Sequence, residues 1–460
     1  MSISSKIHLL KDSVSSDCKI LTDYKDTTFL DYMKRWSDID KQTPAAIVLP
    51  ISEIDTQKTV QWAVGSSIPF VIKSGGHSEW STIGNHGIVI DLSHYSAVNV
   101  HKAAGTVSLK GSVLSKEVAV SLAKEGMCTA LGNGNTVGAI GYFLGGGASI
   151  VTSVLGYGSD QIVSARIITA KGDLVDVTEE KHPDLLWAIR GAGQFVGLIT
   201  ELTIEAHPLS SLGNDEGAIW AGSFVFPLDR AAEVCSAMKV IMNDGRYATA
   251  GLMMIMAPPP ARSPSVVIAA RLTGDLQDAE VAYKSLYDLK PLVTAGSKVP
   301  IQNTSDGREA IGAKGDFKRF GIVGLSGFNE DAFLEVVGLW KEMIAECPDA
   351  ITTAFNFQWD SRLPKPPKFD SALSLHNTRF WQNNLIWHTD PKNRAKVDEY
   401  NEKSLALMRG PDTTTYVDFV NGTRVDPIER RYRPAEKLAK LKQLKKIWDP
   451  TGIFTNQLLD

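Results

Sequence analysis

The chain has 460 residues, of which 43% are apolar, and its 48 lysines and arginines nearly balance its 52 aspartates and glutamates. This composition is typical of a globular protein with two or three domains, and it excludes a polybasic nucleic-acid-binding chain and an acidic disordered one. The sequence has no apolar run near the roughly 18 residues that a bilayer crossing needs. We therefore predict neither a nucleic acid nor a membrane as a partner.

The N-terminal segment and the cysteines favour an intracellular, cytoplasmic protein. The first 16 residues hold no apolar stretch longer than 7–10, which is too short for the core of a secretory signal. The four cysteines, at positions 18, 128, 235 and 347, are far apart and form no CxxC pair. We therefore expect buried thiols rather than a zinc site or a disulfide framework.

Strand-like and helical segments alternate up to about Pro208, which predicts an α/β or α+β first half. The expected strands are bounded by Gly, Ser, Asp or Pro, and the expected helices repeat apolar residues at spacings of three and four. The strands are predicted at 46–49, 69–72, 87–92, 106–110, 163–169 and 197–205, and the helices at 54–64 and 114–126.

A turn-rich break at 207–214 separates this half from a second region. That region runs to about residue 415 and contains most of the bulky aromatic residues but no glycine-rich loop, as expected of a domain that shapes a substrate pocket. Strands are predicted at 218–226, 251–256, 266–272, 320–324, 352–359 and 384–388, with helices at 229–243, 277–287 and 330–346.

The C-terminal tail predicts one amphipathic helix over 434–448. Its apolar residues Leu438, Leu441, Leu444 and Trp448 recur at helical spacing, with lysines at 437, 440, 442 and 445 on the other side. We interpret those lysines as a solvated face rather than a nucleic-acid contact, because no aromatic stacking platform accompanies them.

Three glycine-rich segments carry the strongest functional signal. The first, 74–78, follows an apolar strand, and its paired glycines let main-chain amides converge on an anion. The second, 132–147, has seven glycines in sixteen residues, and the third is 190–200. Such segments suit a backbone that lies flat against a ligand.

Other chemistries find little support in the sequence. The glycines at 132, 134 and 138 and those at 191, 193 and 197 miss the dinucleotide-binding GxGxxG spacing by one residue. The sequence contains no GxSxG elbow, no phosphate-binding GxxxxGK[ST] loop and no HExxH pair. The histidines between 77 and 101 lack the spacing of metal ligands, so we predict no metal site.

Four motifs together carry a resemblance to a known family. They are Ser74-Gly75-Gly76-His77-Ser78, the glycine stretch that begins Thr136-Val137-Gly138, the run 184–191, and the ending Trp448-Asp449-Pro450 with Phe454. In their order and spacing the chain resembles the berberine-bridge-enzyme-like, FAD-linked oxidases of the vanillyl-alcohol-oxidase superfamily, which have a PCMH-type FAD-binding domain.

The resemblance implies an α+β fold in which a two-part FAD-binding domain is interrupted by a substrate domain with an antiparallel sheet flanked by helices. The boundaries expected on this basis are 1–208 for the FAD-binding domain with an N-terminal helical segment, 209–415 for the substrate domain, and 416–460 for the segment that completes the FAD-binding domain.

The resemblance also implies the cofactor, FAD, and the residues that bind it. His77 matches the histidine that joins the 8α-methyl group of FAD through a ring nitrogen. The implied cofactor-binding residues are Lys73, Ser74, Gly75, Gly76, His77 and Ser78 in the first loop, Thr136, Val137, Gly138, Gly141, Tyr142, Gly146 and Gly147 in the second, and Ile199 and Asn421 further along the chain.

Three positions depart from the family pattern. Gly134 stands where many members carry a cysteine that makes a second flavin bond, so a single covalent link through His77 is expected. Lys73 replaces the usual arginine and loses its planar fork. Phe195-Val196 replaces an Asn-Phe pair, so at this loop we expect backbone contacts near Ile199 rather than side-chain contacts.

The implied reaction is the oxidation of a small organic molecule, most simply a secondary metabolite, by hydride transfer to the flavin, with molecular oxygen as electron acceptor and hydrogen peroxide as product. Tyr416 is the candidate catalytic base, although a core tyrosine with a satisfied hydroxyl would give the same pattern. One alternative stays open at this point: a cyclase of the same fold in which oxidation triggers ring closure, or in which flavin only supports it.

Overall fold

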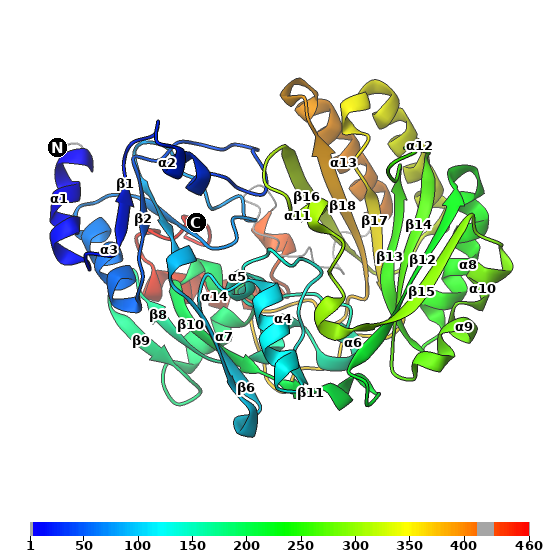
Figure 1. Cartoon of the computed structure of the whole chain (residues 1–460), viewed down its shortest axis with the longest axis horizontal. Coiled ribbons are helices and arrows are strands. Elements are labelled where there is room, and N and C mark those ends of the chain that lie inside the picture. The colour runs from blue at the N-terminus through cyan, green and yellow to red at the C-terminus, as the bar shows by residue number, and fades with distance from the viewer. Residues whose placement is uncertain (1–2, 412–426, 460) are drawn as a thin grey trace.

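The computed structural model describes residues 3–411 and 427–459 of the chain. Two groups of sheets lie side by side, each with its own helices (Figure 1). The first group is built from the first 208 residues and is joined by the C-terminal helix, and the second from residues 218–409. The predicted fold class, α+β with an antiparallel second sheet, is confirmed.

A four-stranded sheet opens the first group, in the order β1-β2-β4-β3. Strands β2, β4 and β3 are parallel, while β1 is antiparallel to β2. Every residue of β2 and β4 is buried, as expected for central parallel strands. The bounds are β1 Lys19–Leu21, β2 Ala46–Leu49, β3 Phe70–Lys73 and β4 Ile88–Asp91, with helices α1 Ile3–Ser13, α2 Thr27–Tyr32 and α3 Glu53–Gly65.

A five-stranded antiparallel sheet follows in the order β5-β6-β10-β8-β9. A short pair, β11 with β7, lies beside it. The strands are β5 Ser96–His101, β6 Thr106–Gly111, β7 Met127–Cys128, β8 Ile162–Ile168, β9 Leu174–Val177, β10 Leu198–Glu205 and β11 His207–Pro208, and the helices are α4 Ser115–Lys124, α5 Ala139–Leu144, α6 Thr152–Leu155 and α7 Pro183–Ala192.

The second group is one seven-stranded antiparallel sheet in the order β15-β12-β14-β13-β17-β18-β16. The bounds are β12 Ala218–Pro227, β13 Ala248–Met256, β14 Ser265–Thr273, β15 Val293–Pro300, β16 Phe317–Leu325, β17 Phe355–Asp360 and β18 Phe380–His388, with helices α8 Ala231–Asn243, α9 Ala279–Ala282, α10 Lys284–Asp288, α11 Glu309–Gly312, α12 Glu330–Glu346 and α13 Arg394–Arg409.

Burial alternates along much of β12 and β13, and the sheet has two different faces. Ile268 and Ile386 on one face pack in a single core with apolar residues of α8, α12 and α13, such as Trp340. We call the opposite face, which carries Arg271, Phe320, Asn356 and Asn383, the inner face. It is this face that meets the first group of sheets.

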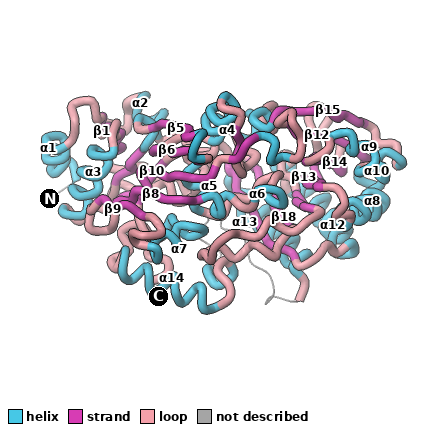
Figure 2. Tube along the Cα trace, turned by 90° about the horizontal axis from the view of Figure 1, so that it is seen from below, coloured by secondary structure: helices cyan, strands magenta, loops and turns pink. Residues whose placement is uncertain are grey.

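Helix α14, Ala435–Trp448, packs against α7 beneath the five-stranded sheet (Figure 2). The predicted solvated lysine face is wrong for Lys445, which is completely buried. Its ammonium group donates to the Phe195 carbonyl and forms an ion pair with Asp449 at 2.5 Å. A lysine at a core-facing helical position was misread because helical spacing alone does not reveal a buried partner.

Two further sequence predictions need correction. The helix predicted at 277–287 is broken into α9 and α10, because Tyr283 turns its ring into the core and bonds to the Arg271 backbone. Strand β15 and helix α13 were not predicted, and β15 is exposed along nearly its whole length, so it carries no alternating pattern. The boundaries 208/209 and 415/416 stay predictions.

Candidate active site

The first two glycine-rich loops lie directly against each other. A side chain at Gly75 would place its Cβ 2.5 Å from the Thr136 carbonyl oxygen, and one at Gly138 would place its Cβ 2.4 Å from Ser74 Oγ. Gly76 adopts the left-handed region with φ 73°, which favours glycine. Close approach of the two loops, rather than flexibility, therefore requires these glycines.

His77 stands half-buried at the junction of the loops. Its Nε2 lies 3.0 Å from Thr136 Oγ1, and its ring stacks on Trp36 with centroids 5.5 Å apart and an interplanar angle of 17°. Burial, reinforced by the positive charges of Lys318 and Lys314, lowers the pKa of His77 to about 4. The imidazole is therefore neutral near pH 7.

Trp36 joins this corner to the inner face of the seven-stranded sheet. Its ring is sandwiched between His77 and Phe320, whose ring lies 5.1 Å away and nearly parallel. Its Nε1 donates to the Ile311 carbonyl at 2.7 Å. Sequence reasoning missed Trp36, because a single tryptophan outside the glycine loops carries no motif. The aromatic stack fixes how far His77 lies from the sheet.

The second glycine-rich loop has two functions. Gly141 is exposed, and a Cβ there would meet open space, so the backbone is accessible at this point. Gly132, Gly147 and Gly158 instead close around the ring of Tyr142, where a Cβ would come within 2.7 to 3.0 Å of ring atoms. The Tyr142 hydroxyl donates to the Ala148 carbonyl. Several of these glycines therefore make room for an aromatic ring.

The structure also shows the local contacts of the remaining residues that were predicted to bind the cofactor. Val137 accepts from the Ser115 amide, Gly138 is the N-cap of α5, and Gly146 accepts from the Ser159 amide. The Ser78 carbonyl accepts from Arg35. Ile199 lies buried in β10, next to an irregularity in its pairing with β8.

Lys73 packs against the first loop, but its ammonium group is bonded to other parts of the chain. Its ammonium group donates to the Tyr32 carbonyl and forms a buried ion pair with Asp91 at 2.8 Å. Its side-chain stem lies beneath Gly76. This arrangement favours a role in supporting the loop over direct contact with a cofactor. Tyr416 and Asn421, the other two predicted site residues, lie outside the described residues.

Two amides face each other on the inner face near Phe320. The register places Asn356 opposite Asn383, between the pair Phe357–Gln382 and the bridge Ala354–Leu385. Within the described part of the chain, neither Oδ1 atom has a hydrogen-bond partner, and Asn356 is only 7% exposed. These acceptors could bind a donor group of a ligand between the two halves.

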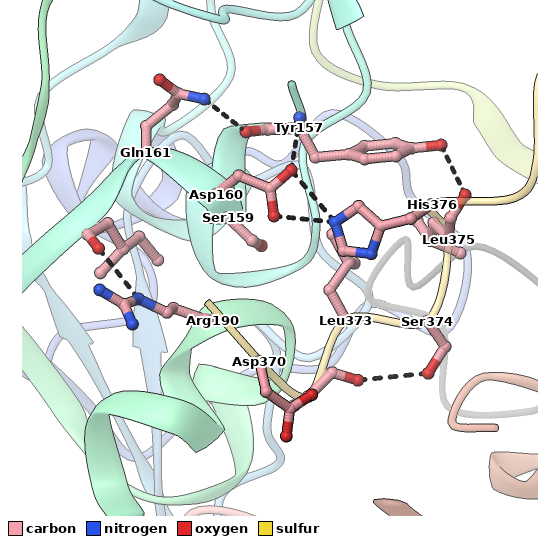
Figure 3. Close-up of polar contacts among 12 residues, drawn as sticks. Tyr157, Ser159, Asp160, Gln161, Arg190, Asp370, Leu373, Ser374, Leu375 and His376 are labelled. Carbon is pink, nitrogen blue, oxygen red and sulfur yellow. Dashed lines mark hydrogen bonds and ion pairs between the residues drawn. The ribbon is translucent and has the colours of Figure 1, made fainter. Parts of the chain in front are cut away.

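A cluster of polar contacts joins the first half of the structure to the segment before β18 (Figure 3). His376 Nε2 lies 2.9 Å from Asp160 Oδ1, and Asp160 also accepts from the Tyr157 amide. The Tyr157 hydroxyl donates to the carbonyls of Leu375 and Thr378. Sequence reasoning missed this cluster, because its partners are more than 200 residues apart.

None of the described helices is long and apolar enough to cross a membrane. Residues 44–178 match the FAD binding domain family. FAD-linked oxidoreductase hasG of Aspergillus fumigatus is 26% identical over 449 residues, which cover 93% of this chain and 94% of that protein. (R)-6-hydroxynicotine oxidase of Paenarthrobacter nicotinovorans is 31% identical over 175 residues, 38% of each chain.

Solved structures show the same fold over nearly the whole chain. Berberine bridge enzyme of Eschscholzia californica superposes with a TM-score of 0.82 at 16% identity, covering 98% of both chains. 6-Hydroxy-D-nicotine oxidase of Arthrobacter nicotinovorans superposes with a TM-score of 0.81 at 22% identity, covering 95% of this chain and 96% of that one. Residues 44–178 therefore form an FAD binding domain, and the chain is an oxidoreductase that is similar to FAD-linked oxidoreductases over nearly its whole length and has the fold of berberine bridge enzyme.

Proposed function

We propose that the protein is an FAD-dependent oxidase of a small organic substrate. One substrate molecule loses a hydride and a proton, and one O2 takes up two electrons and two protons to become hydrogen peroxide. The observation that carries the proposal is the contact between the loops 74–78 and 136–138 within the matched FAD binding domain, with His77 at their junction.

The residues of the two loops fit FAD. Where the loops meet, a Cβ at Gly75 or Gly138 would collide with the opposite loop, and Gly141 borders open space. The main-chain amides of 74–78 and 136–138 would hold the cofactor, and His77 would be its single covalent attachment point. Bound FAD would accept the hydride and pass the electrons to oxygen.

The protonation state of His77 supports the covalent attachment. Only a neutral imidazole has a ring nitrogen free to act as a nucleophile, and the lowered pKa of His77 keeps it neutral at physiological pH. Nε2 is engaged by Thr136, while Trp36 fixes the plane of the ring. The surroundings therefore hold the ring in one orientation before any bond forms.

The substrate would lie between this corner and the inner face of the sheet. The stacked rings of Trp36 and Phe320 would border the substrate there, and the amides of Asn356 and Asn383 would offer it hydrogen-bonding groups. Tyr416 stays our proposed proton acceptor, and Tyr416→Phe should slow substrate-driven flavin reduction by about 10²- to 10⁴-fold while the covalent flavin is retained.

The first test is the nature of the flavin bond. The purified protein should stay yellow after acid precipitation, and mass spectrometry of the intact chain should show one added FAD. His77→Ala should release its flavin into the acid supernatant. A colourless wild-type precipitate beneath a yellow supernatant would contradict the covalent attachment.

The second test is the use of oxygen. Substrates that bleach the flavin under anaerobic conditions should, in air, consume one O2 and yield one hydrogen peroxide per product molecule. Product that forms without flavin reduction and without oxygen consumption would contradict the oxidase and favour the cyclase.

A further inference from the structure

A pocket on the inner face of the sheet is lined by three arginines, Arg271, Arg308 and Arg379, and the guanidinium group of Arg379 donates to the carbonyls of Met242 and Asp360. The glycine-rich loop contributes Asn133 to its wall, and strands β13 and β17 contribute Leu252 and Gln358. The pocket therefore lies between the proposed cofactor loops and the seven-stranded sheet, where a substrate would bind.

Arg271 is held firmly in place although its charge is not balanced. It lies on β14, and Tyr283 accepts a hydrogen bond from its amide and donates one to its carbonyl. Only 9% of the residue is exposed, and one guanidinium nitrogen donates to the neighbouring Ala270 carbonyl. No described acidic residue forms an ion pair with Arg271.

Arg308 brings a second positive charge to the same pocket. It is the N-cap of α11, is half-buried, and makes neither a side-chain hydrogen bond nor an ion pair with the described part of the chain. Burial and the charge of Arg308 together lower the pKa of Arg271 to about 10. A buried and a half-buried guanidinium group that repel each other are costly unless a ligand balances them.

The carboxyl group in the pocket wall does not balance these charges. Asp360 accepts from the Arg362 amide and from Ser153, not from Arg271 or Arg308. Burial raises the pKa of Asp360 to about 7, so a substantial fraction is neutral near physiological pH. The pocket therefore keeps an excess of positive charge.

The pocket also adjoins the His77 corner. Helix α11 starts directly after Arg308, and at its end the Ile311 carbonyl accepts from Trp36 Nε1. A Cβ at Gly312 would lie 2.9 Å from Thr136 Oγ1, the hydroxyl that contacts His77. Gly312, four positions after Arg308, thus lies against the hydroxyl that contacts His77, the proposed flavin attachment site.

We propose that this pocket binds an oxyanion of the substrate, either a carboxylate or a phosphate ester, between Arg271 and Arg308. The planar forks of two arginines match the oxygens of such groups. The identification of the ligand as substrate rests on the proposed oxidase function. The substrate class is therefore an organic acid or a phosphate ester whose oxidised carbon lies away from the anionic end.

Titration calorimetry on the flavin-loaded protein tests the proposal with three probes: benzoate, phenyl phosphate and the neutral benzamide. At least one of the two anions should bind more tightly than benzamide. Tighter binding of benzoate would identify the ligand group as a carboxylate, and tighter binding of phenyl phosphate would identify it as a phosphate ester. Arg271→Gln and Arg308→Gln should each weaken that anion by about 10-fold or more and leave benzamide unchanged. The matched control is Arg246→Gln, which changes an exposed arginine that does not line the pocket and should alter neither affinity.

Several results would overturn the proposal. The first is equal affinity for benzamide and the anions, and the second is no binding of either anion in the millimolar range. The third is an unchanged anion affinity in the Arg308→Gln protein. If Arg271→Gln fails to fold, the Arg308→Gln protein decides the matter alone. Loss of flavin in the arginine variants would also overturn it, because the pair would then contact the cofactor. The binding measurements need no catalytic turnover, so they test the anion site independently of the oxidase proposal. A failure of the oxidase proposal would instead be seen as a flavin that no substrate reduces.

Discussion

At the scale of single residues, the environment of His77 makes a prediction about pH. The ordinary pKa of histidine is about 6.5, and burial with the nearby lysines lowers that of His77 to about 4. Between these values the folded protein keeps the ring neutral while an unfolded chain would take up a proton. This group therefore destabilises the folded state progressively as the pH falls from 6.5 towards 4.

The pH dependence of covalent flavin attachment should follow the pKa of His77 in the folded protein rather than the ordinary pKa of histidine. We expect flavin-free protein mixed with FAD to form the acid-stable bond at a constant rate from neutral pH down to about pH 5, and to lose this ability below about pH 4. Lys314→Gln removes one repelling charge and should move the midpoint upward. The yellow colour of acid precipitates measures the rate. A midpoint near 6.5 would show an imidazole exposed to water.

Gly134 predicts a second effect at this scale. A Cβ at Gly134 would lie 2.7 Å from Val137 Cγ2, so Gly134→Cys alone should leave the flavin singly linked. The double variant Gly134→Cys/Val137→Ala should form a cysteinyl flavin bond in addition to the one at His77. Peptide mapping by flavin absorbance distinguishes these outcomes.

Gly327→Cys, where a Cβ meets open space, is the control and should form no flavin bond. A native cysteinyl link to Cys128 would show that the family cysteine does not correspond to position 134.

At the scale of the elements, Asp449 determines how α14 ends. It forms the completely buried ion pair with Lys445 and accepts from the amides of Ile453 and Phe454. The Trp448-Asp449-Pro450 motif therefore has a structural function, because it holds the C-terminal turn against the loop that contains Phe195.

Replacing Asp449 by Asn should lower the free energy of unfolding by about 3 to 5 kcal/mol, because Lys445 is left buried without its counterion. Urea denaturation measures the loss. Lys445→Met/Asp449→Leu, which removes both charges, should recover a large part of it, and the exposed control Lys446→Met should change stability by less than about 0.5 kcal/mol. Equal stability of Asp449→Asn and wild type would contradict the ion pair.

At the scale of the whole molecule, the contacts at His376 connect the two halves of the structure. The pair Asp160–His376 and the bonds from Tyr157 to Leu375 and Thr378 join a loop of the first half to the segment before β18 (Figure 3). Together with the stack of Trp36 on Phe320, they set the spacing between the glycine-rich loops and the seven-stranded sheet.

We expect His376→Ala to lower the free energy of unfolding by about 1 to 3 kcal/mol, the value of a hydrogen bond to a charged group with low exposure. The control His86→Ala removes an exposed ring and should change stability by less than about 0.5 kcal/mol. Thermal and urea unfolding measure both. If the two variants lose the same stability, the contact with Asp160 contributes nothing.

The sequence predicted well those features that depend on neighbours along the chain. The buried strands β2, β3 and β4 and the helices α3 and α12 follow from unbroken apolar runs or helical spacing, and they were found close to the expected residues. The exposed strand β15 was missed, and the helix before it was predicted unbroken, because their patterns are set by tertiary contacts.

For the candidate site, the motifs identified the two glycine-rich loops and His77, because close backbone approach requires glycine wherever it occurs. What lies against those loops was decided by tertiary structure alone. Trp36, Phe320, Arg271 and Arg308 come from segments more than 270 residues apart at their extremes, and nothing in the local sequence marks them. The sequence by itself thus predicted the fold class and FAD, because its local motifs carry the resemblance to a family; the walls and the charge of the pocket arise only when the two sheets face each other.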